Sequence, residues 1–205
     1  MQIPAQIDAE RLVVRPFRDE DIAAYLEFMT DEEATRHLLL ESAQKTESGA
    51  RTLFDFVRQS YATDEPVWAL AIATEAAGFI GSCGISLISG TVFECYYSLL
   101  PRHWGNGYAT EALRALLGHV FMSTPVTEMR AYMSPANPRS AGVAERIGMV
   151  RKGLQVHPQF GNRGLLYVIT KDEWKASSKS GAGNPPSNAD PHQARITPKP
   201  GSSPD

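Results

Sequence analysis

The sequence predicts one α/β domain over residues 1–175, with a mixed and mainly antiparallel central sheet flanked by helices. Three observations lead to this prediction. Segments with the period of two that is typical of strands alternate with segments of helical period. Three strand-like runs in the middle of the chain are separated by gaps short enough for hairpins. The composition changes after Trp174, where large apolar residues nearly cease.

The composition is that of an ordinary globular protein. Hydrophobic residues make up 42% and charged residues 21%, and a net charge of −3 gives no chain-wide attraction for nucleic acid or for a membrane surface. No apolar stretch approaches the roughly 18 residues of a membrane span. The N-terminal residues lack the basic and apolar segments of a signal peptide. We therefore expect a cytoplasmic protein that binds neither nucleic acid nor membrane.

Residues 176–205 are predicted to form a disordered C-terminal tail. They are rich in Ser, Gly and Pro and contain almost no large apolar side chains. Such a segment cannot bury enough surface to offset the entropy that it would lose on ordering.

The N-terminal part is predicted to contain one strand and two helices. Residues 12–15 form an apolar run that Pro16 ends. Residues 19–30 follow a helical period, and their leading acidic residues suit the positive end of a helix. A second helix is expected over residues 46–61, where the apolar positions are less regular.

The central part is predicted to be an antiparallel meander followed by the most regular helix in the chain. The strands are expected at 68–73, 79–87 and 92–99. The apolar residues between Ala109 and Phe121 then fall on one continuous helical face.

The last part is predicted to contain a strand at 129–133, a short helix, and strands at 149–157 and 165–170. Asn137 is a good N-cap for the short helix, Pro138 suits its first position, and Gly148 follows its end. Residues 160–164 are turn material. The predicted order is β-α-α-β-β-β-α-β-α-β-β.

Residues 98–112, SLLPRHWGNGYATEA, carry the main functional signal. A strand ends here, a loop with Gly105 and Gly107 follows, and the regular helix begins. The first amides of a helix have no internal partner, and glycines let the backbone approach a ligand closely. The combination predicts an anion-binding site, typically for phosphate, although an ordinary turn is the alternative.

The loop does not have the spacing of two common phosphate-binding motifs. No Lys-Ser/Thr pair follows its second glycine, which disfavours a P-loop nucleotide hydrolase. Thr110 stands where a dinucleotide-binding loop would have its third glycine, which disfavours a dehydrogenase.

Residues 102–109, RHWGNGYA, resemble the [Q/R]xxGx[G/A] coenzyme A signature of the GNAT acetyltransferases. Three other segments resemble the branch of this superfamily that contains the Rim-type ribosomal-protein acetyltransferases. These segments are AERLVVRP at residues 9–16, NPRS…AERIGM at residues 137–149, and TKDEW at residues 170–174. The resemblance covers residues 9–174 in the same order and implies a GNAT fold.

The resemblance implies an acetyl-CoA cosubstrate and no metal. Main-chain amides of residues 103–109 would hold the pyrophosphate, namely His103, Trp104, Gly105, Asn106, Gly107, Tyr108 and Ala109. Leu99 and Leu100 would present backbone groups to the pantetheine arm, with an amide near Leu100 stabilising the developing oxyanion. Asn137 would contact the arm, and Ser140 would lie near the sulfur. Arg102 and Arg139 would add positive charge. An N-cap role explains Asn137 equally well, and Arg102 has a solvated surface charge as its alternative.

Three residues are candidates for proton transfer. An amine must lose a proton to attack a thioester, and Glu94 lies on the strand that leads to the glycine loop. Alternation places Glu94, Tyr96 and Ser98 on one face, where a solvent-exposed charge is the competing interpretation. Tyr132 is a second candidate base, and the resemblance implies Ser140 as the group that protonates the sulfur.

The remaining reactive side chains are expected to be structural. Cys83 and Cys95 have no metal-binding spacing and are expected to be free buried thiols. Four histidines, at positions 37, 103, 119 and 157, are isolated in sequence.

The resemblance implies an amine acceptor, either a protein N-terminus or a small molecule, and a monomer or homodimer. The branch commonly has glycine where Tyr96 stands, which puts any particular acceptor in doubt. A non-catalytic acyl-CoA-binding sensor is the alternative function.

Overall fold

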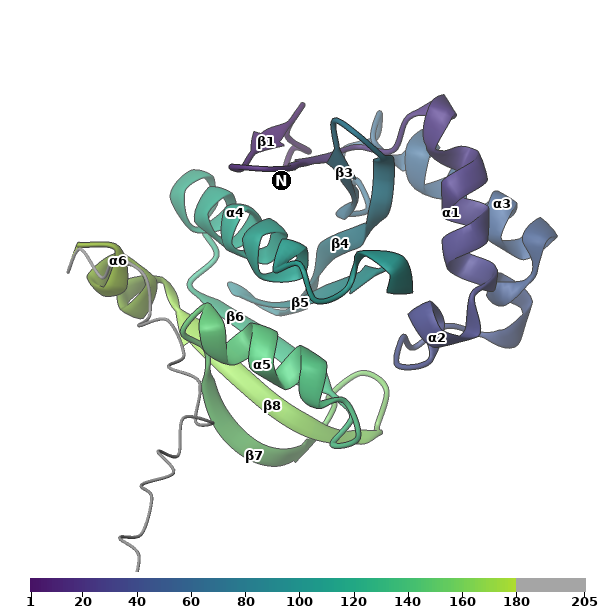
Figure 1. Ribbon diagram of the computed structural model, residues 1–205. Coiled ribbons are helices and arrows are strands. Elements are labelled where there is room, and N and C mark those ends of the chain that lie inside the picture. The colour runs from purple at the N-terminus through teal and green to yellow at the C-terminus, as the bar shows by residue number, and fades with distance from the viewer. Residues whose placement is uncertain (180–205) are drawn as a thin grey trace, which may run out of the picture.

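The computed structural model describes residues 1–179, which form one eight-stranded sheet with helices on both faces (Figure 1). The strand order is β1-β2-β3-β4-β5-β6-β8-β7, and β5 and β6 are the one parallel pair of neighbours in this sheet. The strands are β1 Ile7–Asp8, β2 Val13–Arg15, β3 Ala69–Thr74, β4 Gly78–Ser89, β5 Val92–Leu99, β6 Glu128–Met133, β7 Val150–Val156 and β8 Arg163–Thr170. The predicted mixed, mainly antiparallel sheet and its central meander are confirmed.

Six α-helices and three short 3₁₀ turns connect the strands in the described part of the chain. The helices are α1 Ile22–Thr30, α2 Glu32–Thr35, α3 Glu47–Ser60, α4 Tyr108–Ser123, α5 Pro138–Arg146 and α6 Lys171–Lys179. The 3₁₀ turns are η1 Asp19–Asp21, η2 Ser42–Lys45 and η3 Pro101–His103. The sequence analysis did not predict β1, α2, α6 or the 3₁₀ turns, all of which are short or lie at element ends.

The strand predicted at 165–170 ends at Thr170, as expected, and Lys171 then begins α6, which the sequence analysis did not predict. The carboxylate of Glu173 accepts hydrogen bonds from the amide and hydroxyl of Thr170, at 2.8 and 2.7 Å, which caps the helix. The ring of Trp174 packs 6.1 Å from that of Phe121. Helix α6 passes the domain end predicted at residue 175, and the rest of the predicted tail lies outside the described residues.

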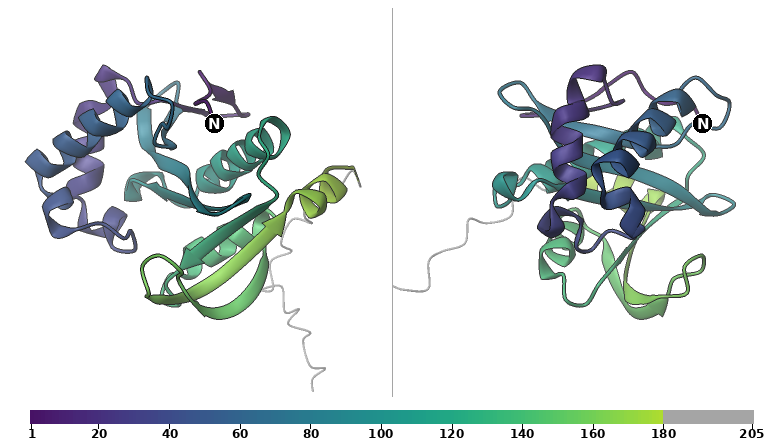
Figure 2. Two further views of the ribbon diagram at one scale, coloured as in Figure 1. Left: turned by 180° about the vertical axis from the view of Figure 1, so that it is seen from behind. Right: turned by 90° about the vertical axis from the view of Figure 1, so that its right-hand side faces the viewer.

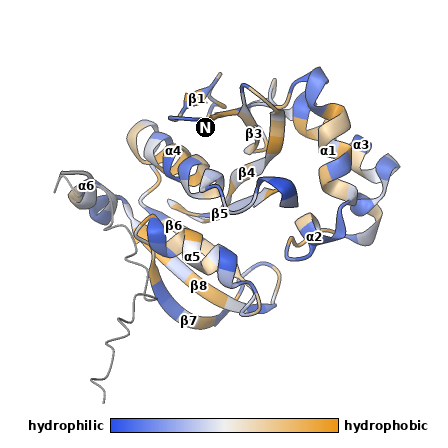
Figure 3. Ribbon diagram, in the orientation of Figure 1, coloured by the Kyte–Doolittle hydropathy of each residue, from blue (hydrophilic) through white to orange (hydrophobic). Residues whose placement is uncertain are grey.

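The core lies in two layers, one on each face of the sheet. Strand β3 shows the division, because Leu70 and Ile72 pack toward α4 and α5 while Ala71 packs toward α1 and α3. Figure 1 shows α4 and α5 together on one side, and the right panel of Figure 2 shows α1, α2 and α3 on the other. Figure 3 shows that β3 and β8 are apolar along most of their length, as strands covered on both faces must be.

The helix predicted from residue 19 begins as the 3₁₀ turn η1, and α1 starts at Ile22. The cause is the buried carboxylate of Asp21, which accepts two hydrogen bonds from the Arg15 guanidinium, at 2.6 and 2.9 Å, and one from the Arg18 amide, at 2.8 Å. Asp21 therefore anchors the turn to Arg15 on β2, and it also places negative charge at the N-terminus of α1.

Strands β5 and β6 separate along their length, and this separation positions the site. Their pairing covers only Val92, Phe93 and Glu94 on β5, and it ends there within the described chain. Beyond Glu94, β5 stays paired with β4 while β6 stays paired with β8. Backbone groups of β5 that would have bonded β6 therefore face a gap, which is a place for an extended ligand.

Candidate functional site

The glycine loop has the backbone geometry that an anion-binding turn requires. After η3, Gly105 and Gly107 adopt φ values of 78° and 79°, a region that other residues rarely occupy. Gly107 is the N-cap of α4, and no side chain caps the helix at this position. The helix N-terminus therefore offers its amides and its partial positive charge to a ligand.

The amides that remain for a ligand differ in part from those predicted. Those of His103 and Trp104 are already donated to the carbonyls of Leu100 and Pro101, at 2.9 and 3.0 Å. The first helical bond runs from the Glu111 amide to the Gly107 carbonyl, at 3.1 Å. Residues 105–110, which include Asn106, Tyr108 and Ala109, thus have main-chain amides with no partner within residues 1–179. The predicted set of 103–109 is wrong for its first two members.

An arginine that the sequence analysis did not single out holds this loop in place. Arg11 precedes β2, and its backbone amide and Nε both donate to the Glu111 carboxylate, at 2.6 and 2.8 Å. Its Nη1 donates to the Asn106 carbonyl at 3.0 Å, and its guanidinium lies 4.9 Å from the centre of the Tyr108 ring. One side chain therefore ties the N-terminal segment to both the loop and the first turn of α4.

Arg102 does not lie among the loop amides. Both of its terminal nitrogens bind the carboxylate of Glu27 on α1, and the two side chains are about half exposed. The exposed pair contributes little to stability, but it directs the Arg102 charge toward α1. Of the two predicted roles, added charge near the phosphates and a solvated surface charge, the pairing with Glu27 favours the second.

Trp104 and Arg139 form a wall between the loop and α5. The Trp104 indole donates through Nε1 to the Leu99 carbonyl at 2.8 Å. The Arg139 guanidinium stacks 4.4 Å from the centre of the Trp104 ring and also approaches Glu33 on α2, at 3.9 Å. The Trp104 ring is half-buried, packs against the core and bonds the backbone of β5.

His103 contains an orphaned polar atom beside the loop. Its Nε2 is buried and has no hydrogen-bond partner within residues 1–179. Burial and the nearby Arg102 charge lower the pKa of His103, so its imidazole is neutral near pH 7. Buried polar atoms normally have partners, so this one is available to a ligand.

The main chain of β5 presents Leu99, not Leu100, to the gap. The Leu100 amide is donated to the Ile80 carbonyl on β4 at 3.0 Å, so the donor predicted near Leu100 would have to be a neighbouring amide. Backbone direction alternates along a strand, so the amides of Leu99 and Tyr97 point away from β4 and toward β6. The carbonyl of Leu99 is occupied by Trp104, which leaves its amide as the donor at this end of the gap.

The first turn of α5 closes the other side of the gap. Asn137 caps the helix by accepting a hydrogen bond from the Ser140 amide at 3.2 Å, and its Nδ2 donates to Ser140 Oγ at 2.9 Å. The hydroxyl of Tyr97 reaches across from β5 to donate to the Ser140 carbonyl at 2.8 Å, and burial raises its pKa. Asn137 thus acts as the N-cap, and Ser140 lies directly over the gap.

Glu94 marks the point where β5 and β6 part. Its side chain is 18% exposed and accepts hydrogen bonds on both oxygens, from Ser86 Oγ at 2.8 Å and from His157 Nε2 at 2.6 Å. The sequence placed Glu94, Tyr96 and Ser98 on one face, and this is confirmed by the partners of these residues on β4 and α2. A held, partly solvated carboxylate is a suitable proton acceptor.

Aromatic side chains lie around the His157 ring, which contacts this carboxylate. The Tyr132 and Phe160 rings lie 4.4 and 4.7 Å from the His157 ring, and Phe160 is 59% exposed. Tyr96 is 37% exposed, but its hydroxyl lies inside the sheet beside Ser82, and burial raises its pKa. Tyr132 contacts the histidine rather than an open space, which makes Glu94 the better placed of the two candidate bases.

Four residues of this site were not assigned from the sequence: Arg11, Ser86, Tyr97 and His157. Arg11 lies in one of the segments that carry the family resemblance, and its charge beside a predicted strand gave no further signal. Alternation placed Tyr97 on the opposite face from Glu94, and an isolated histidine is usually structural. The sequence analysis expected His157 to be structural and gave no sign of its contact with Glu94.

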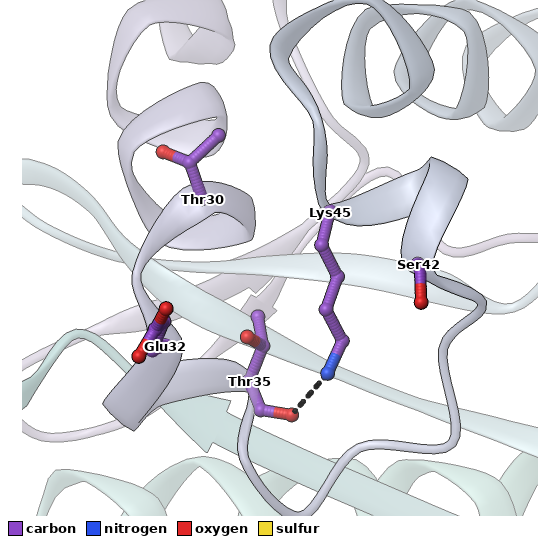
Figure 4. Close-up of a pocket in the computed structure, with 5 residues that line it drawn as sticks. All are labelled: Thr30, Glu32, Thr35, Ser42 and Lys45. Atoms are coloured by element: carbon purple, nitrogen blue, oxygen red, sulfur yellow. Dashed lines mark hydrogen bonds between the residues drawn. The ribbon is translucent and has the colours of Figure 1, made fainter.

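Figure 4 shows a separate pocket between α1, α2 and η2. Its lining residues are Thr30, Glu32, Thr35, Ser42 and Lys45. Lys45 donates to the Thr35 carbonyl at 3.3 Å and so braces the loop that forms the pocket wall. None of the residues predicted for the site takes part.

Residues 1–179 lack the features of a metal site and of a membrane-spanning helix. This part of the chain contains no cluster of three or more His, Cys, Asp or Glu side chains arranged for a metal ion. No helix in it has the length and apolarity needed to cross a membrane. Cys83 and Cys95 are free and buried, as predicted.

Comparison with known proteins agrees with this geometry. Residues 11–150 match the family described as "Acetyltransferase (GNAT) domain". The uncharacterized protein YkkB of Bacillus subtilis (strain 168) is 35% identical over 136 residues, which are 65% of this chain and 70% of YkkB.

Solved structures share the fold. A GNAT-family acetyltransferase from Bacillus anthracis has a TM-score of 0.68 at 23% identity, covering 82% of this chain and 99% of its own. RimJ from Mycobacterium smegmatis, solved with CoA-disulfide, has a TM-score of 0.67 at 18% identity, covering 87% and 98%. At such identities the likeness shows the architecture alone.

Proposed function

Because the chain belongs to the GNAT acetyltransferase family, we propose that it transfers an acetyl group from acetyl-CoA to a primary amine, which attacks the thioester directly. One observation carries the proposal. The stretch where β5 and β6 are unpaired begins at the held carboxylate of Glu94 and ends beside the glycine loop, so a proton acceptor and an anion cradle lie at its two ends.

The residues present suit the cosubstrate. The amides of residues 105–110, at the N-terminus of α4, would hold its pyrophosphate, and the gap would take its extended arm between β5 and the first turn of α5. The left-handed glycines and the orphaned Nε2 of His103 support this assignment. Acetyl-CoA, when bound, supplies a thioester carbonyl that an amine can attack.

Each remaining chemical task has a candidate in this chain. Glu94 would accept the proton of the incoming amine, directly or through water. The Leu99 amide, which faces the gap, would donate to a developing oxyanion. Ser140 Oγ accepts from Asn137, which leaves its own hydrogen available for a departing sulfur. The thiol of a small molecule has a pKa of about 8.5, so a strong acid is not required.

The experiment that tests this function is an acceptor screen with acetyl-CoA. We expect thiol release, followed with a chromogenic disulfide reagent, and a mass increase of one acetyl group on at least one amine. The panel contains small amines and peptides with varied first residues. The native protein should add little background, because burial raises the pKa of Cys95 to about 12 and that of Cys83 further.

Acetyl-CoA binding measured by calorimetry separates the two functions under test. Turnover of any amine above the rate of the boiled protein supports the enzyme. Tight binding without turnover across the whole panel would instead identify the non-catalytic sensor.

Arg11 is predicted to support cosubstrate affinity through the loop that it holds. Removing its guanidinium in Arg11→Ala breaks the side-chain bonds to Glu111 and to the Asn106 carbonyl, while the backbone amide of residue 11 can still donate to Glu111. We expect the Kd for acetyl-CoA to rise by about tenfold, because the lost bonds are charge-assisted but lie at the solvent-exposed surface. Calorimetry is the measurement.

Two companion variants make the Arg11 test specific. Arg11→Lys keeps the charge but cannot reproduce the forked contacts, so it should not restore affinity. Arg102→Ala should have the smaller effect, because Arg102 is engaged with Glu27. A larger loss in Arg102→Ala than in Arg11→Ala would show that the loop is organised differently.

A further inference from the structure

His157 joins the turn after β7 to the strand that carries Glu94. It is 2% exposed, and its Nε2 lies 2.6 Å from Glu94 Oε2. Since β7 and β5 are not neighbours in the sheet, the turn at residues 157–162 must fold across β6 to bring His157 to Glu94, and the His157 ring lies 4.4 Å from that of Tyr132 on β6. A buried histidine carried over a neighbouring strand to one carboxylate requires a physical explanation.

The tautomer of His157 follows from the partners of its other nitrogen. Nδ1 accepts hydrogen bonds from the main-chain amides of Gln159 and Phe160, at 3.2 and 3.3 Å. A nitrogen that accepts carries no hydrogen, so the hydrogen of the neutral ring is on Nε2. His157 therefore donates to Glu94, and the backbone of the turn keeps it in that state.

The carboxylate is thus held by two neutral donors, one on each oxygen. Ser86 on β4 donates to Oε1 and His157 donates to Oε2. No Lys or Arg within residues 1–179 forms an ion pair with Glu94. Arg130, which shares its face of the sheet, binds Glu128 instead, at 2.7 Å. The two donors on different oxygens therefore fix the orientation of the carboxylate without a Lys or Arg partner.

The surroundings protect this contact. The Tyr132 and Phe160 rings lie against the imidazole. Phe160 is exposed to solvent, whereas His157 is buried. Gln159 Nε2 donates to the Leu87 carbonyl at 2.8 Å, which fastens the same turn to β4. The turn is therefore anchored to the sheet independently of His157, and the histidine is free to serve the carboxylate.

We propose that His157 is the positioning residue for the general base, and that its Nε2–H holds the Glu94 carboxylate in place for the amine. This inference rests on the proposed acetyl transfer to an amine. It adds to the proposed base a residue that lies 63 positions from Glu94 in sequence.

Kinetics of three variants test the proposal with the best amine from the acceptor screen. His157→Ala is expected to lower kcat by about 10- to 100-fold, the usual effect of removing a hydrogen-bond partner that orients a functional group. The KM for acetyl-CoA should stay unchanged. His157→Gln retains an N–H donor and should recover most of that loss. Gln159→Ala loosens the turn without touching Glu94, so its kcat should stay near that of the unchanged protein.

Three outcomes would overturn the proposal. An unaltered kcat in His157→Ala excludes a role for the imidazole. A loss in Gln159→Ala equal to that in His157→Ala assigns the effect to the turn as a whole. Failure of His157→Gln to recover activity, with its thermal unfolding unchanged, excludes hydrogen-bond donation as the cause.

Nuclear magnetic resonance gives a test that does not need activity. The ¹⁵N shifts of His157 are expected to show the hydrogen on Nε2 and none on Nδ1, and the Nε2 signal should move in Glu94→Gln. A ring with hydrogen on Nδ1, or a signal indifferent to Glu94, would contradict the proposal. If the unchanged protein acetylates no amine, the proposed function fails, and the ¹⁵N spectrum still decides whether the contact exists.

Discussion

Replacing Glu94 by Gln is expected to lower kcat by about 10²- to 10⁴-fold, the range that a positioned general base contributes. The amide is nearly the same size as the carboxylate but cannot accept a proton from the amine. It also presents an NH₂ group to one of two donors, Ser86 or His157, so one hydrogen bond is lost. Steady-state kinetics with a saturating amine is the measurement.

The control for this substitution lies on the next strand. Glu128 shares the same face of the sheet but binds Arg130, so Glu128→Gln should leave kcat within about threefold, as surface changes usually do. Both variants should bind acetyl-CoA with unchanged affinity in calorimetry. A kcat in Glu94→Gln as high as that in Glu128→Gln would show that another group, or water alone, takes the proton.

Replacing Gly107 by Val is expected to weaken acetyl-CoA binding by at least about tenfold, which corresponds to 1.4 kcal/mol. Gly107 has φ of 79°, a conformation that a β-branched residue avoids, and a Cβ at this position would lie 3.4 Å from an Arg11 nitrogen. The loop must therefore shift, and its amides lose their common direction toward the phosphates. Calorimetry on the folded variant measures the change.

Gly90→Val is the matched control, because it imposes similar strain far from the loop. Gly90 lies in the turn between β4 and β5 with φ of 54°, and a Cβ there would meet no atom within 4 Å. Thermal unfolding should show a comparable loss of stability in both variants, about 1–3 kcal/mol. If Gly107→Val binds acetyl-CoA as tightly as Gly90→Val does, the glycine loop is not the pyrophosphate site.

The sequence predicted the elements whose signals are local. The apolar stripe from Ala109 to Phe121 marks α4 because helical period is a property of neighbouring residues. The short gaps between three strand-like runs predicted the meander for the same reason. Gly105 and Gly107 before a helix predicted an anion cradle, since loop flexibility and unpaired amides both follow from residues close in sequence.

The sequence-based predictions were incomplete where a local pattern is compatible with more than one structure. No helix was predicted after Thr170, but the Glu173 carboxylate caps one there. The ligand-facing amide was predicted only as lying near Leu100, and the register with β4 gives the Leu100 amide itself to Ile80. Strand register depends on which face is buried and on the partner strand, and neither is written in the segment itself.

The sequence by itself determined the fold class, the glycine loop and Glu94 as the candidate base, because short-range periodicity and residue chemistry specify them. Only the tertiary structure decided the contacts between distant segments. Arg11 meets Glu111 across 100 residues, and His157 meets Glu94 across 63. Such pairs form only when the whole sheet has assembled, and the local sequence around either residue gives no indication of its partner.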